Sequence, residues 1–255
     1  MPSRASRFVT RMSDLPEHWI AADLDGTLFS RTQTSGAVAA TWREGEPSSW
    51  MPAPRHALFV RLARLFRIVP VTARDHASFS RVRIAGLPLC DGAVIANGAI
   101  LLEAGTMQPD ANWDAELEPQ LAAWAEPLSE IAARLHEHSS GIAIPRLVAS
   151  NTRYPAYLVA KAHNGFWSTT QGRELCKGVA HFGCRFAEIG RELQVLPPPT
   201  SKRLGLLAFK RRHYGDAPPL LAFGDMPEDL GFLGEAEFLA APTTSTLGRQ
   251  WRNET

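Results

Sequence analysis

The sequence predicts an α/β protein in which a Rossmann-like parallel-sheet core carries an inserted α+β cap domain. Three short apolar runs each end on a polar residue, and such runs between helical patterns are typical of buried parallel strands. These runs are Trp19 to Ala22, Ile68 to Val71 and Leu220 to Phe223. Between the second and third runs the pattern becomes helix, strand, strand, and this order occurs twice, which indicates a separate α+β unit.

The first half of the expected core begins with the strand at 19–22 and the long segment Ser30 to Ala53. That segment is rich in Thr, Ser, Gly and Pro, so we expect either a functional flap or a disordered loop. Pro54 then opens a helical pattern that suits a crossover helix. The predicted apolar stripe of this helix contains Leu58, Leu62, Leu65 and Phe66. After the second strand, the segment Asp91 to Leu102 predicts a hairpin closed by an Asn-Gly turn.

The expected cap begins with an amphipathic helix over residues 113–137, whose apolar residues alternate between spacings of four and three. Pro119 suits the first turn of this helix, and Pro127 is expected to kink or break it. The other predicted cap elements are strands at 142–149 and 154–162, a helix at 170–182, and a hairpin of strands at 185–189 and 192–196.

The domain boundaries follow from these changes in composition. Pro197 to Pro199 closes the inserted unit and returns the chain to the core. We therefore place the core at residues 12–103 and 198–255 and the cap at residues 104–197. The preceding segment, Met1 to Arg11, is expected to be a polar, poorly ordered leader.

Composition and charge exclude several classes of protein. The formal net charge is +1, so we expect no nucleic-acid partner and no association with a membrane. Three cysteines without metal-ligand spacing argue against a disulfide framework or a zinc site and favour a cytoplasmic location. The basic cluster at residues 210–213 is interpreted as a helix C-terminus, where cations complement the helix dipole. Neither the oligomeric state nor the physiological substrate follows from the sequence.

Two carboxylates stand two positions apart where the first strand ends. Asp23 and Asp25 follow the apolar run, Gly26 permits a tight turn, and Thr27 supplies a hydroxyl donor. One carboxylate can act as a nucleophile while it touches a hard cation, and the other can exchange protons with the leaving and attacking oxygens. The pattern indicates metal-assisted phosphoryl chemistry, whereas an isolated Asp-x-Asp-Gly-Thr is also compatible with a structural turn.

The ordered set of strand-end motifs resembles the haloacid dehalogenase (HAD) superfamily of phosphatases. Its motifs are a DxDGT-type strand end, a Ser or Thr at a second strand end, a Lys, and an acidic GDxxxD-type segment. The matching positions are Asp23 to Thr27, Thr72, Lys202 and Gly224 to Asp229. The Asn97-Gly98-Ala99 stretch, with an insertion before Lys202, is similar to the subgroup with a large α/β cap after the third core strand, which includes Cof-type and sucrose-phosphatase-like sugar-phosphate phosphatases.

The resemblance implies a role for each matching residue. Asp23 would attack phosphorus to form an aspartyl-phosphate, and Asp25 would protonate the leaving alcohol and then deprotonate water. Thr72 would hydrogen-bond a phosphoryl oxygen, and Lys202 would offset negative charge. The implied cofactor is Mg²⁺, and its expected residues are Asp23, Asp25 through the backbone carbonyl, Asp225, and Asp229, which would orient Lys202 or a metal-bound water. The expected substrate-binding residues are Thr27, Arg74 and Asn97.

The resulting hypothesis is a Mg²⁺-dependent phosphomonoester hydrolase that acts on a sugar phosphate or a similar small phosphorylated metabolite. Asp25 favours ester cleavage over dehalogenation, because only an ester releases an alcohol that needs a proton. A phosphomutase that uses the same aspartyl-phosphate is the nearest alternative. A binding or regulatory protein without turnover is another, because Met226 and Glu228 replace the small or amide residues that similar phosphatases often have there.

Overall fold

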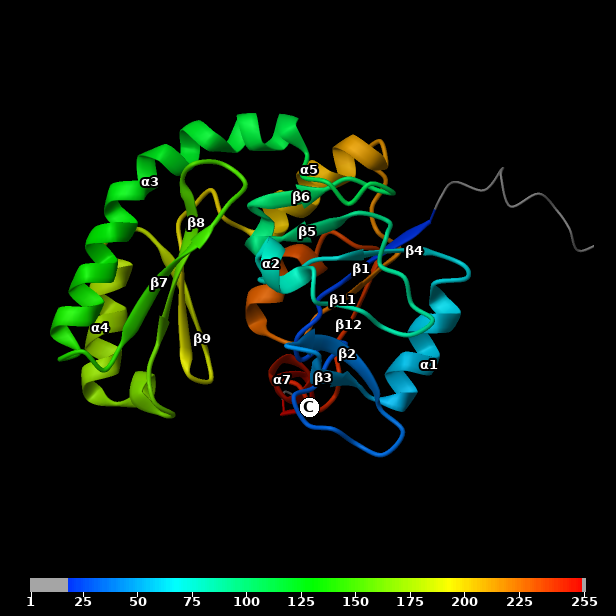
Figure 1. Ribbon diagram of the computed structural model, residues 1–255, viewed down its shortest axis with the longest axis horizontal. Coiled ribbons are helices and arrows are strands. Elements are labelled where there is room, and N and C mark those ends of the chain that lie inside the picture. Colours follow the sequence, from blue (N-terminus) through cyan, green and yellow to red (C-terminus); the bar gives the residue numbers. More distant parts are fainter. Residues whose placement is uncertain (1–17, 254–255) are drawn as a thin grey trace, which may run out of the picture.

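The computed structural model describes residues 18–253 and consists of two α/β parts that lie side by side (Figure 1). One part contains a parallel sheet of four strands, and the part inserted into it contains an antiparallel sheet of four strands. The predicted fold class, a parallel-sheet core with an inserted α+β cap, is confirmed. The expected leader and the expected start of the core at residue 12 lie outside the described residues.

The parallel sheet places its first strand near the centre. In spatial order its strands are β12 (Phe238–Ala240), β11 (Leu221–Phe223), β1 (Trp19–Ala22) and β4 (Arg67–Pro70). All residues of β1 are buried, which explains its unbroken apolar sequence. Ala22 pairs with Phe223 on one side and Pro70 on the other, so the three strands end together. The polar residues that follow them are thereby brought to one end of the sheet.

In one core helix, the buried side chains differ from those that the sequence predicts. The core helices are α1 (Ala53–Leu62), α2 (His76–Phe79), α5 (Lys202–His213), α6 (Leu230–Leu233) and α7 (Thr246–Asn253), with a 3₁₀ turn, η4, at Pro227–Asp229. The predicted stripe of α1 was wrong in part, because Leu58 is 47% exposed and Leu65 is 70% exposed. Phe59 is buried instead and packs edge-on against Phe223. Since α1 ends at Leu62, helical spacing does not extend to Leu65.

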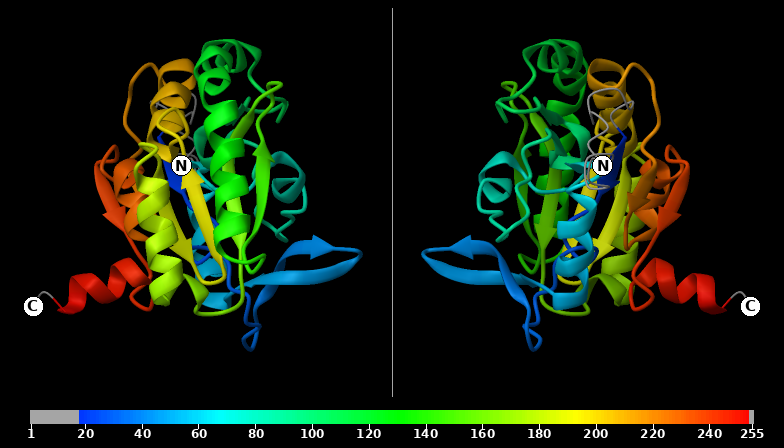
Figure 2. Two further views of the ribbon diagram at one scale, coloured as in Figure 1. Left: turned by 90° about the vertical axis from the view of Figure 1, so that its left-hand side faces the viewer. Right: turned by 90° about the vertical axis from the view of Figure 1, so that its right-hand side faces the viewer.

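Residues 30–53 contain regular structure, so of the two expected alternatives, a functional flap or a disordered loop, disorder was wrong. Strands β2 (Val38–Arg43) and β3 (Glu46–Met51) form an antiparallel hairpin that projects from the core (Figure 2). Glu44 and Gly45 close it with φ angles of 54° and 85°, as a tight hairpin turn requires. The hydroxyls of Thr41 and Ser49 bond across the pair at 2.7 Å. Cross-strand bonds and a tight turn therefore order a segment whose composition resembles a loop.

The predicted Asn-Gly hairpin is confirmed. Strands β5 (Ala93–Ile95) and β6 (Ile100–Leu102) pair antiparallel, and the 3₁₀ turn η2 (Ala96–Gly98) joins them. Gly98 has φ of 90°, and a Cβ there would lie 2.1 Å from the carbonyl oxygen of Ser201. This close approach lets the chain that returns from the cap pass directly over the hairpin.

The cap contains two helices and a four-stranded sheet. Its elements are α3 (Ala111–His138), β7 (Ile144–Ala149), β8 (Pro155–Lys161), the 3₁₀ turn η3 (Phe166–Ser168), α4 (Thr170–Ala180), β9 (Arg185–Ile189) and β10 (Glu192–Leu196). Pro127 does not break α3, which follows a curved path as one helix (Figure 1). Pro119 lies inside the helix rather than in its first turn, because α3 begins at Ala111 with Asp110 as its N-cap.

Core and cap are packed against each other. One cluster of buried apolar side chains includes Ile20 of β1, Leu117 of α3 and Val159 of β8, so it continues from the core into the cap. At the end of α5, Arg212 pairs with Asp110 at 2.9 Å and with Glu116 at 2.6 Å. The basic cluster at 210–213 therefore includes a structural link to α3. Among residues 18–253, no helix combines the length and the apolar character that a membrane crossing needs.

Candidate active site

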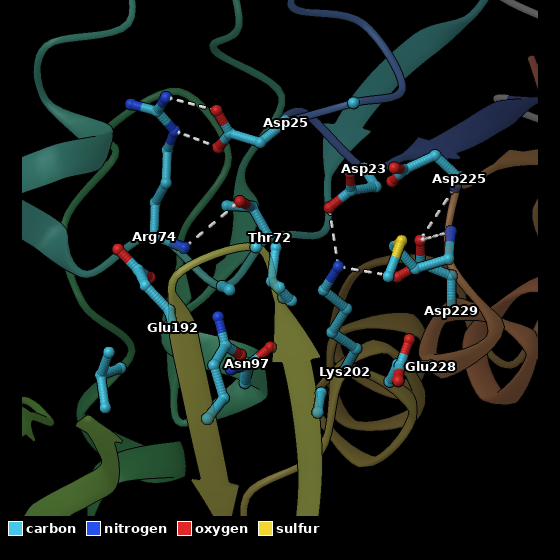
Figure 3. Close-up of a pocket in the computed structure, with 18 of the residues that line it drawn as sticks. Asp23, Asp25, Thr72, Arg74, Asn97, Glu192, Lys202, Asp225, Glu228 and Asp229 are labelled. Carbon is cyan, nitrogen blue, oxygen red and sulfur yellow. Dashed lines mark hydrogen bonds and ion pairs between the residues drawn. The ribbon is translucent and has the colours of Figure 1, made fainter. Parts of the chain in front are cut away.

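The sequence-predicted site residues line one cavity between core and cap, except for Thr27, which is buried beneath it and was expected to bind substrate. Asp23 follows β1, Thr72 follows β4, Asp225 follows β11, and Lys202 begins α5 (Figure 3). The cavity has a volume of about 930 Å³, and the cap sheet forms part of its wall. Parallel α/β sheets commonly bind ligands at the carboxyl ends of their strands, and this cavity occupies that position.

Lys202 holds two buried carboxylates together. Its Nζ donates to Oδ1 of Asp23 at 2.7 Å and to Oδ1 of Asp229 at 2.8 Å. Burial alone would lower the pKa of Lys202, but the two carboxylates raise it above its ordinary value, so the ammonium group stays charged. Burial raises the pKa of Asp23 well above its usual range, and the attraction of Lys202 only partly opposes this. The ammonium group of Lys202 therefore does not fully balance the negative charge of the buried carboxylates.

Asp23, Asp225 and Asp229 form an oxygen-rich cluster in which one ligand atom of each lies within 4.8 Å of the others. Burial and the nearby charge of Asp229 raise the pKa of Asp225 to about 6. The oxygens of Asp229 already accept from Lys202 and from the backbone amides of Asp225 and Met226, the latter two at 3.0 and 3.2 Å. Asp229 thus orients Lys202 and the loop, which leaves Asp23 and Asp225 better placed to bind a cation.

The turn after β1 is fitted tightly around Asp225. Gly26 has φ of 89°, and a Cβ there would lie 2.1 Å from Oδ2 of Asp225. The hydroxyl of Thr27 donates to Oδ1 of Asp225 at 3.1 Å, and Thr27 is buried. Arg55, at the start of α1, donates to the carbonyl oxygens of Gly26 and Thr27. In this structure Thr27 therefore contacts the acidic cluster and helps to position it.

Asp25 and Arg74 form a bidentate ion pair. Nε and Nη2 of Arg74 donate to the two carboxylate oxygens of Asp25 at 2.6 and 2.7 Å, and Figure 3 shows the Asp25 carboxylate turned toward Arg74. Arg74 also donates to the carbonyl oxygen of Ser78. Its guanidinium lies 5.7 Å from the centre of the Phe29 ring. Arg74 is thus placed beside the expected proton-transfer residue.

Two side chains of the core loops face the cap. Thr72 is buried, and its hydroxyl oxygen accepts the backbone amide of Arg74, which leaves the hydroxyl hydrogen to donate to a ligand. Asn97 donates its amide to Oε1 of Gln194 on β10 at 3.1 Å. The hydroxyl of Tyr157 on β8 donates to the carbonyl oxygen of Ala73 at 2.6 Å. Asn97 and the loop after β4 are therefore linked to the cap sheet.

No protein-family model matches the sequence, and no curated protein does. Among solved structures, the sucrose-phosphatase of Synechocystis, in complex with sucrose and phosphate, is similar at 15% identity with a TM-score of 0.55, over 94% of this chain and 88% of that one. A HAD subclass IIB sugar phosphatase is similar at 13% identity with a TM-score of 0.53, over 93% and 98%. A trehalose-6-phosphate phosphatase related protein is similar at 16% identity with a TM-score of 0.51, over 88% and 91%. The chain has the HAD phosphatase fold.

Within this HAD fold, the cap supplies cavity residues that sequence reasoning did not select. Arg146, Tyr157 and Gln194 line the cavity, as does Arg55 of the core. Arg146 and Gln194 both pair with Val159 of β8, and Tyr157 stands two positions before Val159, so these side chains share the sheet face that covers the site. Strand alternation in the sequence identifies such sets, but it does not reveal which of the two faces is turned toward the core.

Proposed function

We propose that this protein is a Mg²⁺-dependent phosphomonoester hydrolase that acts in the cytoplasm on a sugar phosphate or a similar small phosphorylated metabolite. The observation that carries the proposal is the Lys202 ammonium between Asp23 and Asp229, beside Asp225 and Thr72, at the end of the parallel sheet. The three cysteines of the protein are free thiols, which is compatible with a reducing compartment such as the cytoplasm. The similarity to sugar phosphatases supports the substrate class only through the fold.

The donor set fits Mg²⁺. Asp23 and Asp225 offer carboxylate oxygens, the ligand type that Mg²⁺ prefers, and the backbone carbonyl of Asp25 is the third proposed ligand. The raised pKa of Asp225, caused by burial and by Asp229, reflects crowded negative charge that a cation relieves. When bound, the metal ion supplies electrostatic stabilisation of the phosphoryl oxygens.

The chain's own residues then have distinct roles in two steps. In the first, an oxygen of Asp23 forms a bond to phosphorus, the bond to the leaving oxygen breaks, and Asp25 gives that oxygen a proton. In the second, water attacks phosphorus, Asp25 takes its proton, and the bond between Asp23 and phosphorus breaks. Lys202 and Thr72 donate hydrogen bonds to phosphoryl oxygens throughout. To donate a proton, Asp25 has to give up at least one of its bonds to Arg74.

The test is release of inorganic phosphate from a panel of phosphorylated sugars and small metabolites, with Mg²⁺ and with EDTA. We expect metal-dependent release that Asp23→Asn abolishes. Asp91→Asn is a matched control, because Asp91 pairs with Arg67 away from the cavity. An isomerised sugar phosphate without net phosphate release would indicate a mutase instead. A folded protein that binds Mg²⁺ but changes no compound would favour a non-catalytic binding protein.

A further inference from the structure

The cap sheet presents an ordered set of side chains to the cavity. In one row across the strands, Arg146 of β7 pairs with Val159 of β8, Val159 with Gln194 of β10, and Gln194 with Ala187 of β9. All four side chains line the cavity above the catalytic carboxylates. The part of a substrate that is not the transferred phosphate must lie against this row, and Arg146 is its charged member.

Opposite this row, the loop after β4 and the turn after helix α2 contribute further arginines. Arg74 and Arg81 line the same cavity, as does Asp75. Arg146 reaches Asp75 from the cap at 3.6 Å, a separation longer than a hydrogen bond. Burial would raise the pKa of Asp75, but hydrogen bonds from Ser78 and the charges of Arg146 and Arg81 lower it below its usual value. Arg81 from the core and Arg146 from the cap therefore both line the cavity and both favour the charged form of one carboxylate.

Positive charge exceeds negative charge at this junction. Arg74, Arg81 and Arg146 face the carboxylates of Asp25 and Asp75. Asp25 is satisfied by Arg74, and the carboxylate of Asp75 also caps α2 by accepting from the backbone and the hydroxyl of Ser78. One guanidinium charge is thus left without a matching carboxylate, in a cleft where the low-dielectric walls strengthen its field.

Several other cations of the cavity wall have partners of their own. Lys161 pairs with Glu192 at 2.9 Å, Arg203 pairs with Glu235 at 2.6 Å, and Arg185 donates to the carbonyl oxygen of Thr200 at 2.7 Å. The side chain of Arg146 is 59% exposed, and its ion pair within residues 18–253 is the long contact with Asp75. Arg81 and Arg146 both line the cavity and both act on the Asp75 carboxylate, so the unmatched charge lies beside Asp75.

We propose that Arg81 and Arg146 form a second anion site, so that the preferred substrate carries a carboxylate or a second phosphate on its leaving group. This inference rests on the proposed phosphatase function and narrows its substrate class from sugar phosphates in general to phosphorylated acids or bisphosphates. The transferred phosphate lies on Thr72 and Lys202, and the second anion lies between core and cap. Guanidinium groups suit this task because they donate paired hydrogen bonds to carboxylate and phosphate oxygens.

The test uses substrate pairs that differ in one charged group. Glycerol 3-phosphate and 3-phosphoglycerate differ by a hydroxymethyl group against a carboxylate, as do sorbitol 6-phosphate and 6-phosphogluconate. Fructose 6-phosphate and fructose 1,6-bisphosphate test a second phosphate. We expect kcat/KM to be about tenfold or more higher for the anionic member of at least one pair, and this preference to weaken as salt screens the charges. The substrate pair that shows the preference identifies the second anion as a carboxylate or a phosphate.

Two variants and two controls connect this preference to the proposed residues. Arg81→Gln and Arg146→Gln are each expected to reduce the ratio of anionic to neutral kcat/KM by about fivefold to tenfold. Arg83→Gln removes the same charge two residues from Arg81, outside the cavity, and is expected to keep the ratio. Arg173→Gln on α4 is the matched control for the cap.

A measurement of binding without turnover tests the second anion site independently of the proposed hydrolase activity. The Asp23→Asn variant, titrated calorimetrically with the same pairs, measures affinity without turnover. Tighter binding of the anionic members by Asp23→Asn, without phosphate release by the unmodified protein, would refute the hydrolase and leave the anion site standing. Equal kcat/KM and equal affinity within every pair would overturn the anion site, and so would a preference that both arginine variants retain.

Discussion

At the scale of single residues, the partner of each carboxylate decides what it can do. One oxygen of Asp23 accepts from Lys202, so its other oxygen is available to a metal or to phosphorus. Asp229 uses both oxygens on Lys202 and on backbone amides, which suits an orienting role. Asp25 faces Arg74 with both oxygens. Residues of one type at one end of a sheet thus acquire different functions.

The proposed proton-transfer role of Asp25 predicts a dependence on the leaving group. Asp25→Asn is expected to reduce kcat/KM for alkyl phosphates, which reports the steps up to release of the alcohol, by about 100-fold or more, because the alcohol must leave without a proton. The loss is expected to be much smaller for 4-nitrophenyl phosphate, whose phenolate is a good leaving group. Steady-state kinetics with both substrates measures the difference. Equal losses for both would show that Asp25 serves binding or folding rather than proton transfer.

The cysteines provide a prediction about pH and reactivity. Burial raises the pKa of Cys176 and that of Cys184 to about 11, whereas Cys90 is exposed. A raised pKa means a smaller thiolate fraction, so at about pH 8 the two buried thiols are expected to react slowly with a disulfide reagent. We expect one rapid thiol equivalent per chain in the native protein, and Cys90→Ser should remove it. Rapid reaction of all thiols would contradict the burial of Cys176 on α4 and of Cys184 before β9.

At the scale of elements, β8 and β10 connect the cap to the core loops that follow β4 and β5. Tyr157 of β8 bonds the carbonyl oxygen of Ala73, the residue after Thr72, and Gln194 of β10 bonds Asn97. Burial raises the pKa of Tyr157 far above its ordinary value, so its hydroxyl remains a donor at all physiological pH values. The cap therefore positions the loop after β4 as well as covering it.

Removal of this link is expected to weaken the fold measurably. Tyr157→Phe deletes the hydroxyl, leaves the Ala73 carbonyl without that donor, and should cost about 1 kcal/mol of unfolding free energy. Urea denaturation monitored by tryptophan fluorescence measures it. Tyr154→Phe, the same deletion just before β8, is the control, and an equal effect of the two substitutions would show that the bond to Ala73 contributes nothing.

At the scale of the whole molecule, core and cap share buried surface while the site between them concentrates charge. The apolar cluster that joins β1 to α3 and β8 favours unfolding of both parts together. The acidic cluster at the sheet end opposes this stability, since it holds three carboxylates and Lys202 forms ion pairs with two of them, Asp23 and Asp229. A bound cation is therefore expected to stabilise the entire fold.

Metal binding should appear as a shift of the thermal midpoint. At ten times its dissociation constant, a ligand that binds only the native state adds about 1.4 kcal/mol, which corresponds to a rise in Tm of roughly 3 to 6 °C for a chain of this size. Calorimetry with Mg²⁺ and with EDTA measures this rise. Asp225→Asn is expected to abolish the rise and Asp91→Asn to retain it. A rise that persists in Asp225→Asn would place the metal elsewhere.

Much of the fold was predictable because it depends on local patterns. Apolar runs at β1, β4 and β11 and the Asn-Gly turn were readable from composition and spacing. The β2–β3 hairpin was missed because Pro47 and the Ser and Thr residues resemble a loop until cross-strand bonds are seen. Leu65 was assigned to the α1 stripe because the end of that helix carries no strong signal in the sequence.

The sequence by itself determined which chemistry-bearing residues stand at strand ends, because residues that follow parallel strands of one sheet share one end of it. Asp23, Thr72 and Asp225 belong to that set. Only the tertiary structure decided their partners and the rest of the cavity. The pairing of Asp25 with Arg74 and the contact of Arg146 with Asp75 join segments that are distant along the chain. The spacing of residues along the sequence does not reveal such contacts, because they depend on how the cap sheet packs over the core.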